Sequence, residues 1–217
     1  MDVQKCYTGA VASDAWHADF PSAMLQASIE FQQSLTAYSS NPRFFCRSHM
    51  IEMGIQEASE AWDLLEGGWK HHKTNPKPTD WSELLMECVD VAVYLSNACF
   101  YADKSDGLDA FSTSNWSRIA SCASNYRGVP LAPSIVYFGR GAHGDDNTKE
   151  CALRISEVRF YLFKVMCGSD KTFTRYVRSA SESLVRAVCA AGYSQADFIN
   201  AYASKMRTNH VRQAGGY

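Results

Sequence analysis

The sequence has no surplus of charge of either sign. Its 21 lysines and arginines stand against 23 aspartates and glutamates, so the formal net charge is −2. Binding to nucleic acid favours a basic surplus, so we expect no nucleic-acid partner. No stretch of about 18 uninterrupted apolar residues occurs, so we expect no membrane-spanning helix. The first residues include Asp2 and lack a sustained apolar segment, which predicts no signal peptide.

Cysteine and histidine motifs typical of metal sites are also lacking. None of the eight cysteines forms a Cys-x-x-Cys pair, and Cys88, Cys99 and Cys189 lie within apolar helical patterns. We therefore expect reduced thiols in a cytoplasmic protein rather than disulfides or a zinc site. None of the six histidines follows a helical glutamate by three residues. A di-iron bundle needs such Glu-x-x-His motifs, so we do not expect one.

Helical patterns fill most of the chain. Pro21 suits a first helical turn, and Asn41-Pro42 marks a second helix start. Asp80 is placed to cap a third helix, and Ser194 to cap the last. The predicted helices cover about residues 21–38, 42–66, 80–102, 147–167, 171–191 and 194–213. The sequence therefore predicts an all-α helical bundle, in one domain over residues 1–217.

Residues 103–145 interrupt this helical pattern. They are rich in serine, glycine, asparagine and proline, and only 114–124 suggests a short helix. Alternation typical of a strand occurs only over 134–138. A long irregular segment inside a compact chain is unusual unless it has a function, so we predict a loop or lid inserted between helices.

Two pairs of acidic residues carry the main chemical signal. Glu57 and Glu60 are three residues apart in one predicted helix, and Glu87 and Asp90 are three apart in the next. Residues with this spacing share one face of an α-helix. The connection between the two helices is short, so we expect them to be antiparallel, with the four carboxylates facing each other.

The surroundings of the second pair favour a metal site. Glu87 and Asp90 lie among leucine, valine, alanine and methionine, which predicts a largely buried helix. A buried, unpaired carboxylate costs several kcal/mol, and a divalent cation would remove both this cost and the mutual repulsion. Oxygen ligands select Mg²⁺ or Mn²⁺. The simpler alternative, two solvated acidic faces with chance spacing, suits a lone Glu-x-x-Glu better than two adjacent motifs.

Basic residues follow the first acidic helix and recur near the C-terminus. Lys70 and Lys73 come after that helix, in the segment that leads to the second acidic pair. Lys205, Asn209 and Arg212 are spaced to share one stripe of the last helix. Both sets suit binding of phosphate oxygens, and both are equally compatible with ordinary solvated charges.

These motifs resemble those of the dimeric dUTPases, which include phage-type dUTPases and the related dCTP/dUTP pyrophosphatases. The family belongs to the MazG-like all-α NTP pyrophosphatases, and it carries Glu-x-x-Glu, a Trp-Lys-rich turn and Glu-x-x-Asp in this order. Its C-terminal signature is matched here by Tyr202, Lys205, Asn209, Arg212, Gln213, Gly216 and Tyr217. The motifs cover roughly residues 24–102 and 193–217.

The resemblance implies a homodimer that hydrolyses dUTP to dUMP and pyrophosphate. It implies that Glu57, Glu60, Glu87 and Asp90 bind Mg²⁺, with Mn²⁺ as an alternative. Phage-type members act in the cytoplasm of the host. The implied substrate-binding residues are Gln32, at the base, and Trp69, Lys70, Lys73, Tyr202, Lys205, Asn209 and Arg212.

Two positions leave the base open. Thr36 stands four residues after Gln32, where the family often has Asn, and Val93 stands three after Asp90, where it often has His. The alternatives to dUTP are therefore dCTP, dTTP or a modified pyrimidine nucleotide. An alternative of another class is a catalytically silent helical dimer that binds nucleotide or a protein. Of these alternatives we expect the chain to be an enzyme, in which Glu57 deprotonates the attacking water.

Overall fold

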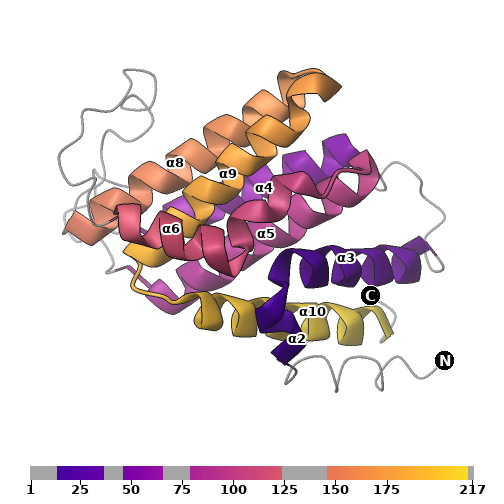
Figure 1. Cartoon of the computed structure of the whole chain (residues 1–217), viewed down its shortest axis with the longest axis horizontal. Coiled ribbons are helices and arrows are strands. Elements are labelled where there is room, and N and C mark those ends of the chain that lie inside the picture. The colour runs from indigo at the N-terminus through magenta and orange to yellow at the C-terminus, as the bar shows by residue number, and fades with distance from the viewer. Residues whose placement is uncertain (1–13, 37–45, 66–78, 124–145, 215–217) are drawn as a thin grey trace.

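The computed structural model describes residues 14–36, 46–65, 79–123 and 146–214 (Figure 1). Over these ranges the chain is helical, without strands, which confirms the all-α prediction. The helices are α2 (Asp14–Ala18), α3 (Phe20–Thr36), α4 (Arg47–Asp63), α5 (Trp81–Ala102), η3 (Asp106–Phe111), α6 (Thr113–Ala123), α8 (Asp146–Cys167), α9 (Asp170–Ala190) and α10 (Gln195–Ala214). The segment 134–138, where the sequence alternates as in a strand, lies outside the described residues.

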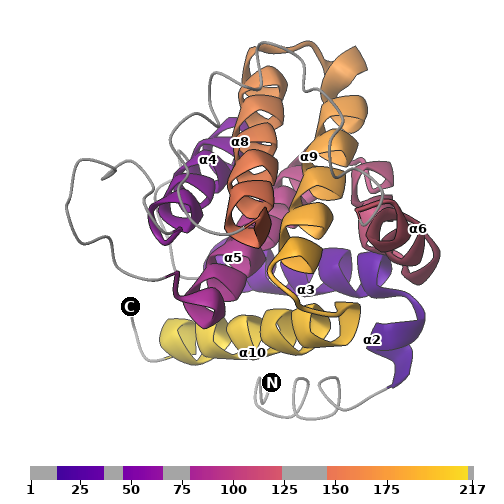
Figure 2. The same ribbon diagram turned by 90° about the vertical axis from the view of Figure 1, so that its left-hand side faces the viewer.

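Four long helices form the body of the molecule. Helix α8 packs against α9 and α4, while α5 packs against α4 and α9. Helices α3 and α10 lie across the lower part of α5, as the two views at right angles show (Figures 1 and 2). Helix α5 therefore touches helices from both the N-terminal and the C-terminal parts of the chain.

Local sequence signals account for several helix ends. The Asp80 carboxylate accepts a hydrogen bond of 3.1 Å from the Glu83 backbone, as expected for the cap of α5. Ser194 and Asp197 form the predicted capping box of α10, with the Ser194 backbone donating to the Asp197 carboxylate at 2.8 Å. Helix α9 is followed by Gly192 at φ +89°, a conformation that favours glycine.

The second predicted helix is shorter than its sequence pattern indicated. Within the described residues α4 begins at Arg47, after the extended Cys46, and ends at Asp63 rather than near Glu66. The proposed start at Asn41-Pro42 lies outside the described residues.

The irregular insert predicted for 103–145 begins later than expected. Residues 106–111 form η3, and the short helix expected at 114–124 is present as α6. Leu108 and Phe111 of η3 are fully buried, as is Ile119 of α6. The surface excursion predicted for this part is therefore wrong up to residue 123, and the remainder, 124–145, lies outside the described residues.

An aromatic cluster joins the lower helices to η3. Phe111 of η3 stacks on Phe198 of α10, with ring centroids 5.7 Å apart and planes at 4°. Phe20 of α3 meets Tyr202 of α10 edge to face at 5.4 Å. Burial of each such side chain contributes about 1.5–3 kcal/mol, so the cluster fixes α10 beside α3.

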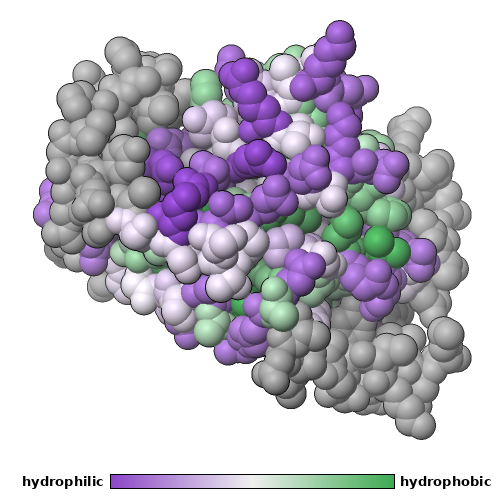
Figure 3. All heavy atoms as spheres, viewed as in Figure 1, coloured by the Kyte–Doolittle hydropathy of each residue, from purple (hydrophilic) through white to green (hydrophobic). Residues whose placement is uncertain are grey.

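Helix α5 is the central core helix. Its 22 residues include an 18-residue window of mean hydropathy 1.3, long and apolar enough by composition to cross a membrane. Two thirds of that window (67%) is buried inside the protein, which identifies it as a core helix. On the face in Figure 3, hydrophilic residues cover most of the surface and hydrophobic ones gather toward the right.

The described cysteines form no disulfide. Cys88 and Cys99 are buried, as the helical patterns predicted, and so is Cys151, whereas Cys189 is half-buried. Burial raises the pKa of both the Cys88 and the Cys99 thiols to about 12, so these thiols stay protonated at neutral pH.

Candidate active site

Helices α4 and α5 lie side by side in opposite directions. A Cβ atom on Gly54 of α4 would lie 3.5 Å from the Tyr94 Cβ of α5. Nearer the other end of the pair, Ala61 packs in one cluster with Leu84. A side chain of one carbon at Gly54 would therefore make ordinary van der Waals contact, and the acidic residues of both helices meet between these two contacts.

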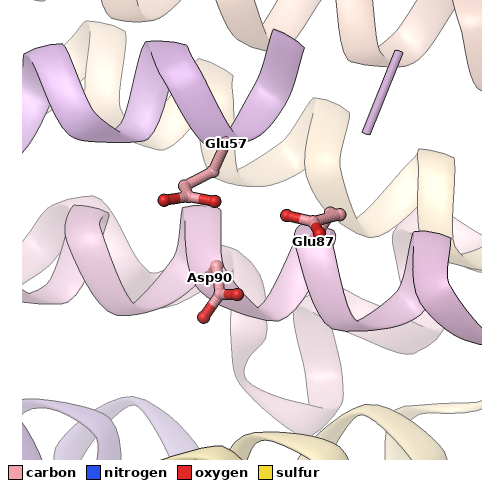
Figure 4. A group of neighbouring side chains, drawn as sticks. All are labelled: Glu57, Glu87 and Asp90. Atoms are coloured by element: carbon pink, nitrogen blue, oxygen red, sulfur yellow. The ribbon is translucent and has the colours of Figure 1, made fainter. Parts of the chain in front are cut away.

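Three of the four predicted carboxylates converge. Oxygen atoms of Glu57, Glu87 and Asp90 all lie within 4.8 Å of one another, in a group that could hold a metal ion. In Figure 4 Glu57 points from α4 toward α5, the helix that carries Glu87 and Asp90. The spacing argument therefore placed these three residues correctly.

Glu60 lies at the edge of this carboxylate group. Its side chain accepts a hydrogen bond of 3.0 Å from Gln56, one turn earlier in α4. Its charge still helps to raise the pKa values of Glu57 and Glu87, so it lies within electrostatic range of them. Glu60 is not one of the three converging residues, so its predicted role as a ligand requires its side chain to turn toward α5.

The carboxylates of Glu57, Glu87 and Asp90 repel one another in the absence of a cation. Burial, followed by the charges of Asp90 and Glu57, raises the pKa of Glu87 to about 7. Burial, followed by the charges of Asp90 and Glu60, also raises the pKa of Glu57, while its hydrogen bond with Glu87 opposes that shift. One proton shared by the pair is therefore favoured near neutral pH.

The residues present fit a divalent cation. Glu87 Oε2 is buried and has no hydrogen-bond partner among the described residues. Buried polar atoms in folded proteins almost always have a partner. A hard cation would coordinate this oxygen, replace the shared proton and remove the carboxylate repulsion in one step.

A lysine from the last helix completes the group. Lys205 Nζ of α10 donates to Asp90 Oδ2 at 2.6 Å, and the Asp90 side chain is only 14% exposed. Burial raises the pKa of Asp90, while Lys205 and the more distant Arg212 oppose that shift. The structure therefore brings Lys205 to the acidic residues, with Asn209 and Arg212 farther along the same helix.

The other predicted substrate residues are distributed around α5. Gln32 of α3 is buried, and its Oε1 accepts a hydrogen bond of 2.7 Å from the Tyr101 hydroxyl of α5. Tyr202 is fully buried in the aromatic cluster, with its hydroxyl toward Ser28 and Ser96. The side chains of Trp69, Lys70, Lys73 and Thr36 lie outside the described residues.

Sequence reasoning missed one side of α5. Tyr94, Asn97 and Tyr101 follow Asp90 at intervals of four, three and four residues, which places all four on one face of the helix. The pKa of Tyr94 is raised to about 12 by burial and by the nearby carboxylates of Glu57 and Asp90. The helical period of polar residues after Asp90 is the signal that could have found this stripe.

The bundle brings together carboxylates from two adjacent helices and a lysine from a third. This arrangement is typical of proteins that use divalent cations to act on phosphates. The chain belongs to the dimeric all-α dUTPase family, because a family model described as dUTPase matches residues 23–217. Membership makes it a hydrolase acting on dUTP, in a family that uses divalent metal. No curated protein and no solved structure matched the chain.

Proposed function

We propose that the chain hydrolyses dUTP to dUMP and pyrophosphate with Mg²⁺ held by Glu57, Glu60, Glu87 and Asp90. The convergence of three of these carboxylates within 4.8 Å carries the proposal. Mn²⁺ has the same preference for oxygen ligands and is the alternative ion. When bound, the ions supply Lewis acidity toward the triphosphate and toward the attacking water.

Glu57 is the residue proposed to deprotonate that water. Its carboxylate lies close to those of Glu87 and Asp90, and burial raises its pKa, which makes it a stronger base than an exposed glutamate. The water attacks the phosphorus between the nucleoside and pyrophosphate, and the oxygen that leaves with pyrophosphate takes the negative charge. Glu57 keeps the proton until the product leaves.

Basic residues are proposed to neutralise the leaving group. Lys205 is already held at the site by Asp90, so a triphosphate on the carboxylates would lie within its reach. Arg212 is on the same helix, and Lys70 and Lys73 are proposed to contribute from the segment between α4 and α5. Gln32, Trp69, Tyr202 and Asn209 are the residues proposed to shape the nucleoside pocket.

A panel of deoxynucleoside triphosphates, assayed for pyrophosphate release with Mg²⁺, tests the substrate. We expect dUTP to be the best substrate. A preference for dCTP, dTTP or a modified pyrimidine nucleotide would change the assigned base and leave the proposed reaction unchanged. Asp90→Asn and Glu60→Gln are expected to abolish turnover with an unchanged helical circular dichroism spectrum. Full activity in either variant would contradict the metal assignment.

The assembly and compartment are also proposals. We propose a homodimer, as in the family, acting in the cytoplasm, where its buried cysteines would stay reduced. Light scattering behind a size-exclusion column measures the mass directly, and a monomer at micromolar concentration would contradict the dimer.

A further inference from the structure

A buried amide oxygen on α5 has no hydrogen-bond partner among the described residues. Asn97 is 2% exposed, and its Oδ1 is buried without a hydrogen bond among the described residues. An unsatisfied buried carbonyl typically costs about 1–3 kcal/mol, so such atoms in folded proteins are usually paired with water or a ligand. The position of Asn97 in the molecule indicates whether that partner is water or a ligand.

Asn97 lies on the same face of α5 as the acidic group. It is seven residues after Asp90, two helical turns or about 10 Å along the axis. Tyr94 lies between them, close enough to the carboxylates for their charges to affect its pKa. Beyond Asn97 the stripe ends at Tyr101, whose hydroxyl is hydrogen-bonded to Gln32. The face therefore changes from charged to neutral polar groups toward the C-terminal end of the helix.

The opposite direction along α5 has a different chemistry. The same stripe continues from Asp90 back to Met86 and the exposed Glu83. The negative charge of Glu83 at that end disfavours a nucleotide. The neutral amide and phenol groups at the other end suit a nucleoside. With phosphates at the carboxylates, the sugar and base are thus expected to extend toward Asn97.

We propose that Asn97 is a specificity-determining residue whose Oδ1 accepts a hydrogen bond from the N3–H of a uracil base. Uracil joined to deoxyribose has a single N–H group, and a fixed acceptor matches it. An N–H bond to a buried acceptor discriminates strongly, because a base without that N–H leaves the carbonyl unpaired. This inference rests on the proposed function, because the phosphates at the carboxylates set the direction of the nucleoside.

The test compares dUTP with N3-methyl-dUTP, which lacks the N–H, on the wild type and on Asn97→Ala. We expect the wild type to prefer dUTP in kcat/KM by on the order of 10- to 100-fold. We expect Asn97→Ala to lose most of that preference, since it has no acceptor and leaves room for the methyl group. An equal fall for both nucleotides would overturn the inference and assign Asn97 to structure or to a trapped water.

Ser181→Ala is the matched control. Ser181 of α9 is also fully buried, with a hydroxyl that has no partner among the described residues, but it belongs to a helix that carries none of the site residues. Removal of the Ser181 hydroxyl should leave the preference for dUTP over N3-methyl-dUTP unchanged. Asn97→Leu, which keeps the volume without the acceptor, covers the case in which the alanine variant unfolds, and the same loss of preference is expected.

Failure of the proposed function is recognised separately. Absence of dUTP hydrolysis by the wild type would overturn that function, whatever Asn97 does. Calorimetric titration with dUMP then decides the inference. Binding that is weakened in Asn97→Ala and kept in Ser181→Ala supports it, and indistinguishable titrations of wild type and Asn97→Ala overturn it.

Discussion

Glu87 shows how one residue can couple folding to a cation. Its carboxylate is half-buried, has an unpartnered oxygen and faces two other acids. Lys205 offsets part of the repulsion through Asp90, and without a cation the rest favours keeping a proton at the site. A proton and a divalent cation therefore compete for the same oxygens.

This competition predicts the pH dependence of stability in EDTA. The folded-state pKa of Glu87, about 7, is above the ordinary glutamate value of 4.5, so the folded chain binds more protons between these values. The free energy of unfolding is expected to fall as pH rises through this range, and Mg²⁺ should stabilise most at the alkaline end. Thermal melts from about pH 5 to about pH 8 measure both.

Glu87→Gln provides the comparison for that experiment. The variant cannot ionise at this position, so its melting temperature in EDTA should change less with pH, and it should respond less to Mg²⁺. A wild-type melting temperature that rises from pH 5 to about pH 7 in EDTA would contradict the assigned shift.

Tyr101 is expected to be a positioning residue for Gln32. The phenol donates to the buried Gln32 Oε1, so this hydrogen bond fixes the orientation of the Gln32 amide. In Tyr101→Phe the carbonyl loses its donor, and we expect KM for dUTP to rise several-fold with a smaller change in kcat, for a loss of about 1 kcal/mol. Tyr161→Phe, at a half-buried tyrosine of α8, is the control, and an equal effect there would remove the specific role of Tyr101.

At the scale of elements, the sequence predicted helices whose ends have local signals. Asp80 and Ser194 cap their helices through contacts within one turn, and such contacts can be read from spacing. Residues 106–111 carry no helical period of useful length, and their burial comes from packing against α9. That contact joins residues far apart in the chain, so composition alone suggested a surface loop.

Gly107 is the closest point of that contact. A Cβ at this position would lie 2.6 Å from Val177 Cγ1 of α9, well inside contact distance. Gly107→Ala should therefore push η3 away from α9 and lower stability by about 1–3 kcal/mol. Urea unfolding measures the loss. Val177→Ala removes the clashing methyl groups, and the double variant should lose less than the sum of the single variants if this contact is the cause.

At the scale of the whole molecule, the convergence of the acidic residues was the predictable part of the candidate site. Two acidic pairs at helical spacing are visible in a sequence, and the structure brings Glu57, Glu87 and Asp90 together. The unpartnered Oδ1 of Asn97 and the bond between Tyr101 and Gln32 are properties of packing. The sequence of an apolar helix does not show whether the amide of an asparagine has a hydrogen-bond partner. These groups could therefore be recognised only from the structure.

The contact between Lys205 and Asp90 can be tested against a neighbour on the same helix. Lys205→Gln removes the positive charge at the carboxylates, and we expect kcat/KM for dUTP to fall on the order of 10- to 100-fold. Arg207→Gln changes an exposed charge of α10 and should leave it unchanged. Similar losses in both variants would indicate a general electrostatic effect rather than a role at the site.

The ion pair between Lys205 and Asp90 joins residues 115 positions apart. During synthesis the acidic helices leave the ribosome long before their counter-charge does. A nascent chain can form the α4–α5 pair early, but it carries the unrelieved carboxylates until its final helix emerges and docks. On the proposed function, free cation in the cell would be the first partner available to those carboxylates, and metal uptake would precede completion of the fold. The ability to catalyse would then be the last property that the growing polypeptide acquires.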